Sequence, residues 1–218
     1  MRKIVFILLS VLGALTAYSQ KTCTDSMSID AAFNACIAMR DAAASNDSAA
    51  IKQSAIALKA VGATHFSSLH CKDDSTASLN GHLVFDEAFA DSLAEGKDVY
   101  GEADDMNRTR THRGQYTDGK VHTKTCFVKA GKSTKYSFGS KGHQELAVVA
   151  EAGGLVTMKI HVTNSSGLDF RKDDTKSVKK GMPQRKTSFD LPNDRRNTVE
   201  LEIVNCGKKD ISFVVISN

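Results

Sequence analysis

The segment Val199-Glu200-Leu201-Glu202-Ile203-Val204 alternates apolar and acidic side chains. Successive side chains of an extended strand point to opposite faces, so this period of two predicts a strand with one buried and one solvated face. The segment Met158-Lys159-Ile160-His161-Val162 repeats the pattern with basic residues. We therefore expect residues 158–162 and 199–204 to lie in antiparallel sheets that cover a core on one side.

Outward from this segment, the same pattern continues through the C-terminal half of the chain. Short apolar runs alternate with turns rich in Gly, Asn, Ser and Lys, which is typical of antiparallel β proteins. Seven strands are predicted, at residues 125–128, 135–138, 145–151, 156–163, 187–191, 198–205 and 211–217. This spacing indicates an antiparallel sandwich of about seven or eight strands.

The N-terminal third has a helical period instead. Residues 26–66 predict two helices that a short turn joins into an antiparallel hairpin. One apolar stripe holds Ile29, Phe33, Cys36, Ile37 and Ala44, and the other holds Ile51, Ala55, Leu58 and Val61. Because alanine makes both stripes thin, we expect the hairpin to pack against another part of the protein.

Capping residues mark the ends of these helices. Ser28 is expected to cap the first helix, the Ser-Asn-Asp-Ser cluster at 45–48 to end it and cap the second, and Gly62 to stop the second. Residues 79–85 predict a strand that runs into a helix capped by Asp86. The chain is thus expected to be an α+β protein, with a helical hairpin region ahead of the sandwich.

The first nineteen residues, MRKIVFILLSVLGALTAYS, have the features of a secretory signal peptide. Arg2 and Lys3 form a basic start, an apolar run follows, and the small residues Ala17 and Ser19 precede the expected cleavage site. The run is too short to span a bilayer, and no other segment is long enough. We expect a secreted or periplasmic protein without a transmembrane segment after cleavage.

Composition divides the remainder into three parts. Residues 20–95 form the predicted helical region, residues 96–119 a charged linker with few apolar side chains, and residues 120–218 the sandwich domain. Residues 20–94 carry 5 basic and 9 acidic side chains, whereas residues 120–218 carry 18 basic and 10 acidic ones. This asymmetry favours either attraction between the two parts or an anionic partner for the second.

Five segments of the C-terminal half stand in a distinctive order. Tyr136-Ser137-Phe138, residues 146–150, Ser188-Phe189-Asp190, residues 199–205 and residues 212–215 follow one another in a way that resembles the bacterial pre-peptidase C-terminal β-sandwich module. The resemblance covers residues 124–218 and implies a jelly-roll-like, non-catalytic accessory domain that aids targeting or binding. The basic insertion at 169–186 departs from the family's pattern, and no recognisable peptidase precedes the sandwich.

Five cysteines follow the leader, and an oxidising compartment favours disulfides between them. Cys126 opens the first predicted strand of the sandwich and Cys206 ends the penultimate one, so we expect a bridge between them. The helical hairpin returns Cys71 towards Cys23, which predicts a second bridge. Cys36 lies on the apolar stripe and is expected to be a buried thiol, although which of the three N-terminal cysteines is unpaired stays open.

The histidine, cysteine and carboxylate residues match no familiar catalytic or metal-binding spacing. We therefore expect neither a metal nor a cofactor, and favour a non-catalytic protein over an enzyme. The alternative is a secreted hydrolase whose site lies between the helical region and the sandwich, with His65, His70 or His82 taking part.

A basic stretch at residues 169–186 is the strongest candidate for a binding site. With the turn at 208–209 it would form a basic lip for an acidic glycan, a lipid phosphate or an acidic protein surface. The candidates are Arg171, Lys172, Lys176, Lys179, Lys180, Arg185, Lys186, Lys208 and Lys209. Nucleic acid is not expected, because Phe170 is the only aromatic residue among these charges. The alternative is a solvated loop whose charges only keep the protein soluble.

Overall fold

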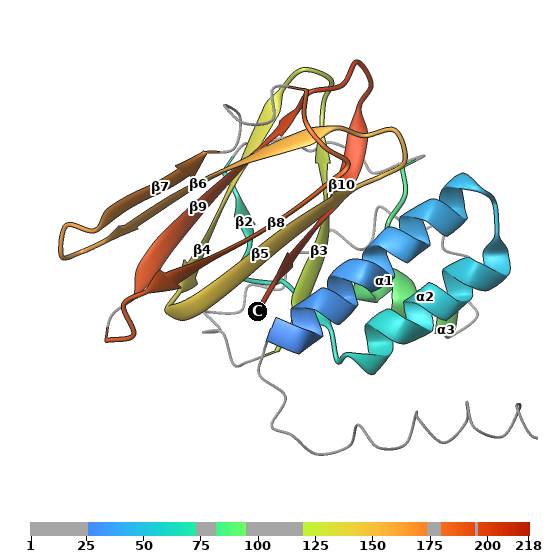
Figure 1. Cartoon of the computed structure of the whole chain (residues 1–218), viewed down its shortest axis with the longest axis horizontal. Coiled ribbons are helices and arrows are strands. Elements are labelled where there is room, and N and C mark those ends of the chain that lie inside the picture. Colours follow the sequence, from blue (N-terminus) through green and yellow to red (C-terminus); the bar gives the residue numbers. More distant parts are fainter. Residues whose placement is uncertain (1–25, 73–81, 95–119, 174–179, 195) are drawn as a thin grey trace, which may run out of the picture.

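The computed structural model describes residues 26–72, 82–94, 120–173, 180–194 and 196–218. Two five-stranded sheets face each other, and a layer of helices covers the outer face of one of them (Figure 1). No helix in these ranges is long and apolar enough to cross a bilayer. The expected signal peptide, Cys23 and the linker at 96–119 lie outside the described residues.

Eight strands of the two sheets form a jelly roll. The first sheet has the order β1 (Thr64–His65), β3 (His122–Val128), β10 (Ile211–Ser217), β5 (Gly142–Ala150) and β8 (Gln184–Leu191). The second has the order β2 (His70–Cys71), β4 (Ser133–Ser140), β9 (Asn197–Asn205), β6 (Val156–Asn164) and β7 (Asp169–Asp173). The neighbouring pairs β3–β10, β4–β9, β5–β8 and β6–β7 belong in turn to the first, second, first and second sheet, which is the arrangement of a jelly roll. The predicted α+β class with a jelly-roll-like sandwich is confirmed.

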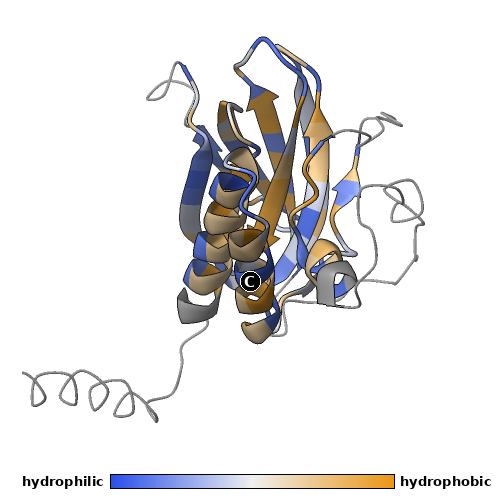
Figure 2. Cartoon of the chain, turned by 90° about the vertical axis from the view of Figure 1, so that its right-hand side faces the viewer, coloured by the Kyte–Doolittle hydropathy of each residue, from blue (hydrophilic) through white to orange (hydrophobic). Residues whose placement is uncertain are grey.

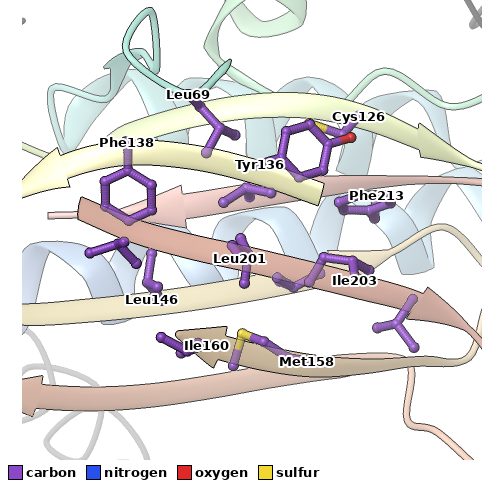
Figure 3. Close-up of a cluster of buried hydrophobic side chains, with 14 of the residues drawn as sticks. Leu69, Cys126, Tyr136, Phe138, Leu146, Met158, Ile160, Leu201, Ile203 and Phe213 are labelled. Atoms are coloured by element: carbon purple, nitrogen blue, oxygen red, sulfur yellow. The ribbon is translucent and has the colours of Figure 1, made fainter. Parts of the chain in front are cut away.

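The core of the sandwich lies between the sheets, where the predicted alternation places it. On β9, Val199, Leu201 and Ile203 are buried while Glu200 and Glu202 face outward. Figure 3 shows the hydrophobic cluster to which these residues belong. Tyr136 and Phe138 of β4 are part of it and face the strands of the first sheet. All seven strands predicted from the sequence are present in the structure.

The central strands of the first sheet, β10 and β5, are buried on both faces. Every residue of β10 is buried: Phe213 and Val215 belong to the core of the sandwich, whereas Val214 and Ile216 pack with the helices. Successive side chains of the neighbouring strand β5 also alternate between the core of the sandwich and the contact with the helices. A strand that is covered on both faces has apolar residues at successive positions. This explains why apolar and polar residues do not alternate in the sequences of β5 and β10.

The helical layer consists of α1 (Ser26–Ala44), α2 (Ser48–Ala60) and α3 (Glu87–Ala94). Seen from the helical side in Figure 2, hydrophobic strand segments lie directly behind it. Ile29 and Cys36 of α1 and Leu58 of α2 are fully buried as the stripes predict. The prediction that Ala44 lies on the buried stripe was wrong, because Ala44 is exposed. Met39 and Ala42 continue the buried face of α1 instead.

Two of the three predicted caps of the hairpin are found. The carboxylate of Asp47 accepts a hydrogen bond from the Ala50 amide at 3.0 Å, and Gly62 follows the end of α2 with a φ of +70° that suits glycine. The prediction for Ser28 was wrong, because α1 begins at Ser26 and contains it.

The strand predicted at 79–85 is absent from its described part, residues 82–85. Here the backbone donates to side chains of the sandwich: the Leu83 amide to Glu151 at 3.2 Å, and the Phe85 amide to Thr125 at 3.3 Å. Side-chain acceptors thus take the place of a neighbouring strand, which an apolar sequence pattern does not reveal.

Asp86, the predicted cap of α3, also attaches that helix to the sandwich. Its Oδ1 accepts from the amides of Ala88 and Phe89, and its Oδ2 accepts from the amide of Thr125 on β3 at 2.6 Å. Burial and the neighbouring carboxylate of Glu87 raise the pKa of Asp86 above its ordinary value, and its hydrogen bonds partly oppose this shift. The cap prediction is confirmed, and one carboxylate serves two elements.

Three strands were not predicted. Strand β7 lies within the stretch expected to be a basic loop, and all five of its residues are exposed, so its sequence does not alternate. Pairing with β6 makes it a strand, and Phe170 stacks on Phe189 of β8 across the open side of the sandwich, with ring centroids 5.8 Å apart. Strands β1 and β2 have only two residues each, and they extend the two sheets at the opposite side.

The predicted bridge between Cys126 and Cys206 is wrong. Cys126 lies on β3 of the first sheet, opposite Phe213 of β10, whereas Cys206 follows β9 of the second sheet, and both are free thiols. Burial raises the pKa of Cys126 to about 12, and its side chain lies beside Tyr136 (Figure 3). Cys36 is a buried thiol as expected, and Cys71 is exposed on β2.

Cysteine labelling tests this arrangement. We expect iodoacetamide to modify Cys206 in the folded protein while Cys36 and Cys126 react only after unfolding, because their thiols are buried and stay protonated. Peptide mapping after non-reducing digestion measures both the labelling and the bridges. Recovery of a peptide in which Cys126 is joined to Cys206 would contradict the structure.

Replacement of Asp86 tests the attachment of α3. We expect Asp86→Ala to lower the free energy of unfolding by about 3 kcal/mol, because it removes a helix cap and leaves the Thr125 amide without its acceptor. Urea titration measures the change. The control is Asp91→Ala on the same helix, where an exposed ion pair with Lys59 contributes about 0.5 kcal/mol. Equal losses in the two variants would argue against the role given to Asp86.

Candidate binding surfaces

The nine basic residues predicted as a site are distributed over several elements. Arg171 and Lys172 lie on β7, Arg185 and Lys186 on β8, and Lys208 and Lys209 in the turn between β9 and β10. Lys180 directly precedes the segment that leads into β8. Lys176 and Lys179 lie outside the described residues. The candidates therefore do not form one continuous loop.

Several of these charges have structural partners. Arg171 forms an ion pair with Asp169 at 3.1 Å, and Lys172 donates to the backbone oxygen of Ser188 at 3.3 Å. Lys186 contacts Asp30 of α1 and lies 3.4 Å from a carboxylate oxygen of Glu145. Lys186 thereby holds the helical layer against the edge of the first sheet, and its charge is largely neutralised there.

Lys180, Lys208 and Lys209 instead lie at one end of the sandwich, together with two lysines outside the predicted site. Lys129 and Lys132 flank the turn between β3 and β4, which a hydrogen bond from the Lys132 amide to the Lys129 oxygen closes at 3.1 Å. We call these five residues the lysine-rich end: Lys129, Lys132, Lys180, Lys208 and Lys209. In Figure 1 the β3–β4 and β9–β10 turns lie next to each other at the top of the sandwich.

Asn205 and Cys206 join the three segments of this end. The Asn205 amide donates to the Lys132 oxygen at 2.9 Å, and the Asn205 side chain donates to the Lys209 oxygen at 2.7 Å. Gly181 packs so closely on Cys206 that a β-carbon there would lie 3.0 Å from the cysteine Cβ. Backbone contacts therefore fix the relative positions of all three lysine-bearing segments.

The positive charge of the lysine-rich end is not neutralised by the residues described around it. All five lysines are exposed, and no ion pair between described residues involves any of them. Asp210 is the acid within the turn, and one of its oxygens accepts a hydrogen bond from the Ala130 amide at 2.9 Å. This end therefore presents an excess of exposed ammonium groups.

The outer face of the second sheet forms a second charged surface. A depression of about 330 Å³ lies on it, lined by residues of β4, β6, β7 and β9 and by Lys72. Lys72 contacts Glu200, Lys159 lies 3.6 Å from Glu202, and His161 lies 3.4 Å from Glu200. Opposite charges alternate across the strands, so this surface compensates much of its own charge.

The carboxylates of this surface are stabilised in their ionised form. The hydrogen bond from Lys72, with a contribution from His161, holds the pKa of Glu200 below its ordinary value. Arg171, again with His161, does the same for Asp169. His161 thus connects strands β6, β7 and β9 through two carboxylates, which favours a cross-strand role for it.

The three histidines of the hydrolase alternative do not come together. His65 contacts Glu87 of α3 at 3.2 Å, His70 lies on β2 of the second sheet, and His82 contacts Glu151 at 2.9 Å. Ser212 donates to the same Glu151 at 2.9 Å, so the carboxylate lies between serine and histidine. A serine nucleophile needs the histidine in that position. Across the described ranges, no three His, Cys, Asp or Glu side chains are placed to hold a metal ion.

The pH dependence of stability tests the ion pairs of the second sheet. Because the folded protein lowers the pKa of Glu200, its ionised form contributes stability above the ordinary pKa near 4.5, and this is lost as the pH falls through the folded value. We expect Glu200→Gln to cost about 0.5 kcal/mol at neutral pH and less at pH 3, which is well below the ordinary pKa of the carboxyl. Urea titration at both pH values measures this, with Glu202→Gln as the control for the looser pair with Lys159. A cost that is unchanged at pH 3 would contradict this assignment.

Comparison with known proteins assigns the chain to no family. No family model matches the chain, and no curated protein matches it. Solved structures that resemble part of it include a mitogen derived from Yersinia pseudotuberculosis, with 8% identity, a TM-score of 0.35, and coverage of 45% of this chain and 85% of the other.

Two further structures show a similar partial likeness. The carbohydrate-binding module TmCBM61, in complex with β-1,4-galactotriose, has 10% identity and a TM-score of 0.27 over 45% of this chain and 81% of the other. PliG of Salmonella Typhimurium, a periplasmic inhibitor of g-type lysozyme, has 14% identity and a TM-score of 0.29 over 48% of this chain and 94% of its own. At these identities and TM-scores, no ligand or activity of this chain can be inferred from those proteins.

Proposed function

We propose that this protein is an exported, non-catalytic binding module that holds an anionic ligand at its lysine-rich end. The observation that carries the proposal is the convergence of five exposed lysines from three segments, without carboxylate partners among the described residues. The expected signal peptide supports a secreted or periplasmic location. The resemblance to an accessory sandwich module supports a role in binding.

The scaffold suits this role because hydrogen bonds hold the turns together while the charged side chains are exposed. Binding residues often lie on loops that a stable fold positions, and here the backbones of the turns are fixed by Asn205 while the lysine side chains extend outward. Lysine ammonium groups act as point charges without the planar geometry of arginine. Such a set recognises dense negative charge better than the shape of one small anion.

The chemistry of these segments narrows the ligand. Residues 129–132, 180–182 and 206–210 contain no aromatic side chain on which a base or a sugar ring could stack. Acidic glycans, lipid phosphates and acidic protein surfaces remain the ligand classes that the charge favours. We expect binding to depend strongly on ionic strength, since exposed charges are screened by salt.

Replacement of the five lysines tests the proposal. We expect the variant with Lys129, Lys132, Lys180, Lys208 and Lys209 changed to Ser to bind immobilised heparin at least about tenfold more weakly, because about 1.4 kcal/mol of electrostatic attraction is lost. Affinity is measured by surface plasmon resonance at several salt concentrations.

A matched variant controls for net charge. It changes five exposed lysines away from this end to Ser, namely Lys52, Lys59, Lys120, Lys135 and Lys141, and so loses the same formal charge. We expect it to retain most of the affinity. If both variants bind equally weakly, or if the first binds as the unmodified protein does, the lysine-rich end is not the binding site.

A further inference from the structure

The lysine-rich end has an apolar side chain beside its charges. Met182 is 42% exposed, one of three large hydrophobic residues exposed in the described part of the chain. Its backbone forms two hydrogen bonds of 2.9 Å with Val156 at the start of β6, and the preceding Gly181 packs on Cys206. Met182 is therefore held in place next to Lys180 and the β9–β10 turn.

At the lysine-rich end, turns project beyond the ends of the strands. The lysines extend from connections beyond the ends of the strands, and the depression described above lies on the outer face of the second sheet and includes none of them. Sites for sugars and other small ligands are usually concave and lined by aromatic side chains. Projecting turns with several lysines and one exposed apolar residue instead fit a broad negative surface with an apolar layer beneath it.

We propose that the lysine-rich end docks onto a bilayer surface that contains anionic phospholipids, with Met182 inserted below the lipid phosphates. This inference rests on the proposed function, because it names the anionic partner of the same site. Lysines near such a surface are attracted to its anionic lipids, and the attraction falls off within a Debye length. A soluble polyanion could attract the same lysines, but it would gain nothing from Met182. Docking should therefore be peripheral, reversible and sensitive to salt.

Tryptophan fluorescence can test the orientation directly, because the chain contains no tryptophan. In Met182→Trp the indole is the single reporter at the lysine-rich end. We expect its emission to shift to shorter wavelength with vesicles of phosphatidylcholine and phosphatidylglycerol, and not with phosphatidylcholine alone. The matched control is Ile56→Trp, since Ile56 is 58% exposed on α2 in the helical layer. We expect no shift there even when the protein sediments with the vesicles.

A second variant separates the lipid from other anions. We expect Met182→Ser to bind anionic vesicles about threefold more weakly, because one partly buried apolar side chain is lost, while its affinity for soluble heparin is unchanged. Co-sedimentation and heparin affinity are measured on the same preparations. An equal effect on both ligands, a wavelength shift for Ile56→Trp, or tighter binding to an immobilised acidic protein than to vesicles would overturn the membrane inference.

The two proposals can fail separately. If the five lysines bind heparin but the protein does not bind anionic vesicles, the membrane inference is wrong and the proposed anion-binding function is supported. If the protein binds neither heparin nor anionic vesicles, both are wrong. Both proposals are supported if three results are obtained together. The protein binds anionic vesicles, the emission of Met182→Trp shifts to shorter wavelength with them, and the variant without the five lysines does not bind them.

Discussion

The packing of the helical layer against the first sheet is the contact on which the architecture depends. Ala147 and Val149 of β5 and Val214 and Ile216 of β10 face away from the core of the sandwich, and the helices remove all four from water. Without this cover the protein would expose an apolar patch in the middle of the sheet, which soluble proteins avoid. Lys186 and Asp86 add polar attachments at the edge of the layer.

This packing makes the two outer faces of the sandwich unequal. One face is occupied by helices, while the other carries cross-strand ion pairs such as Lys159 with Glu202. The turns at the ends of the strands are then the places where charge can accumulate without compensation. The lysine-rich end is such a place, because Asn205 connects its turns through the backbone and leaves the lysine side chains to solvent.

Local features of the sequence predicted local features of the structure. The alternation in β9, the cap at Asp47 and the stop at Gly62 involve residues close together in the chain, and each is present. Strand β7 was missed because its residues are all exposed and only its pairing with β6 makes it a strand. The strand expected at 79–85 is absent from its described part, residues 82–85, because Glu151 and Thr125, both distant in sequence, accept the backbone hydrogen bonds there.

The sequence by itself determined the class of the fold, because the period of its apolar residues decides which faces are buried. It also indicated that the C-terminal half is basic. Only the tertiary structure decided which charges stand together: the order of the strands brings Lys132 next to Asn205 and Lys209, and pairs Lys186 with Asp30. It likewise placed Cys126 and Cys206 in different sheets. Contacts between residues far apart in the chain follow from strand order, and no local pattern encodes them.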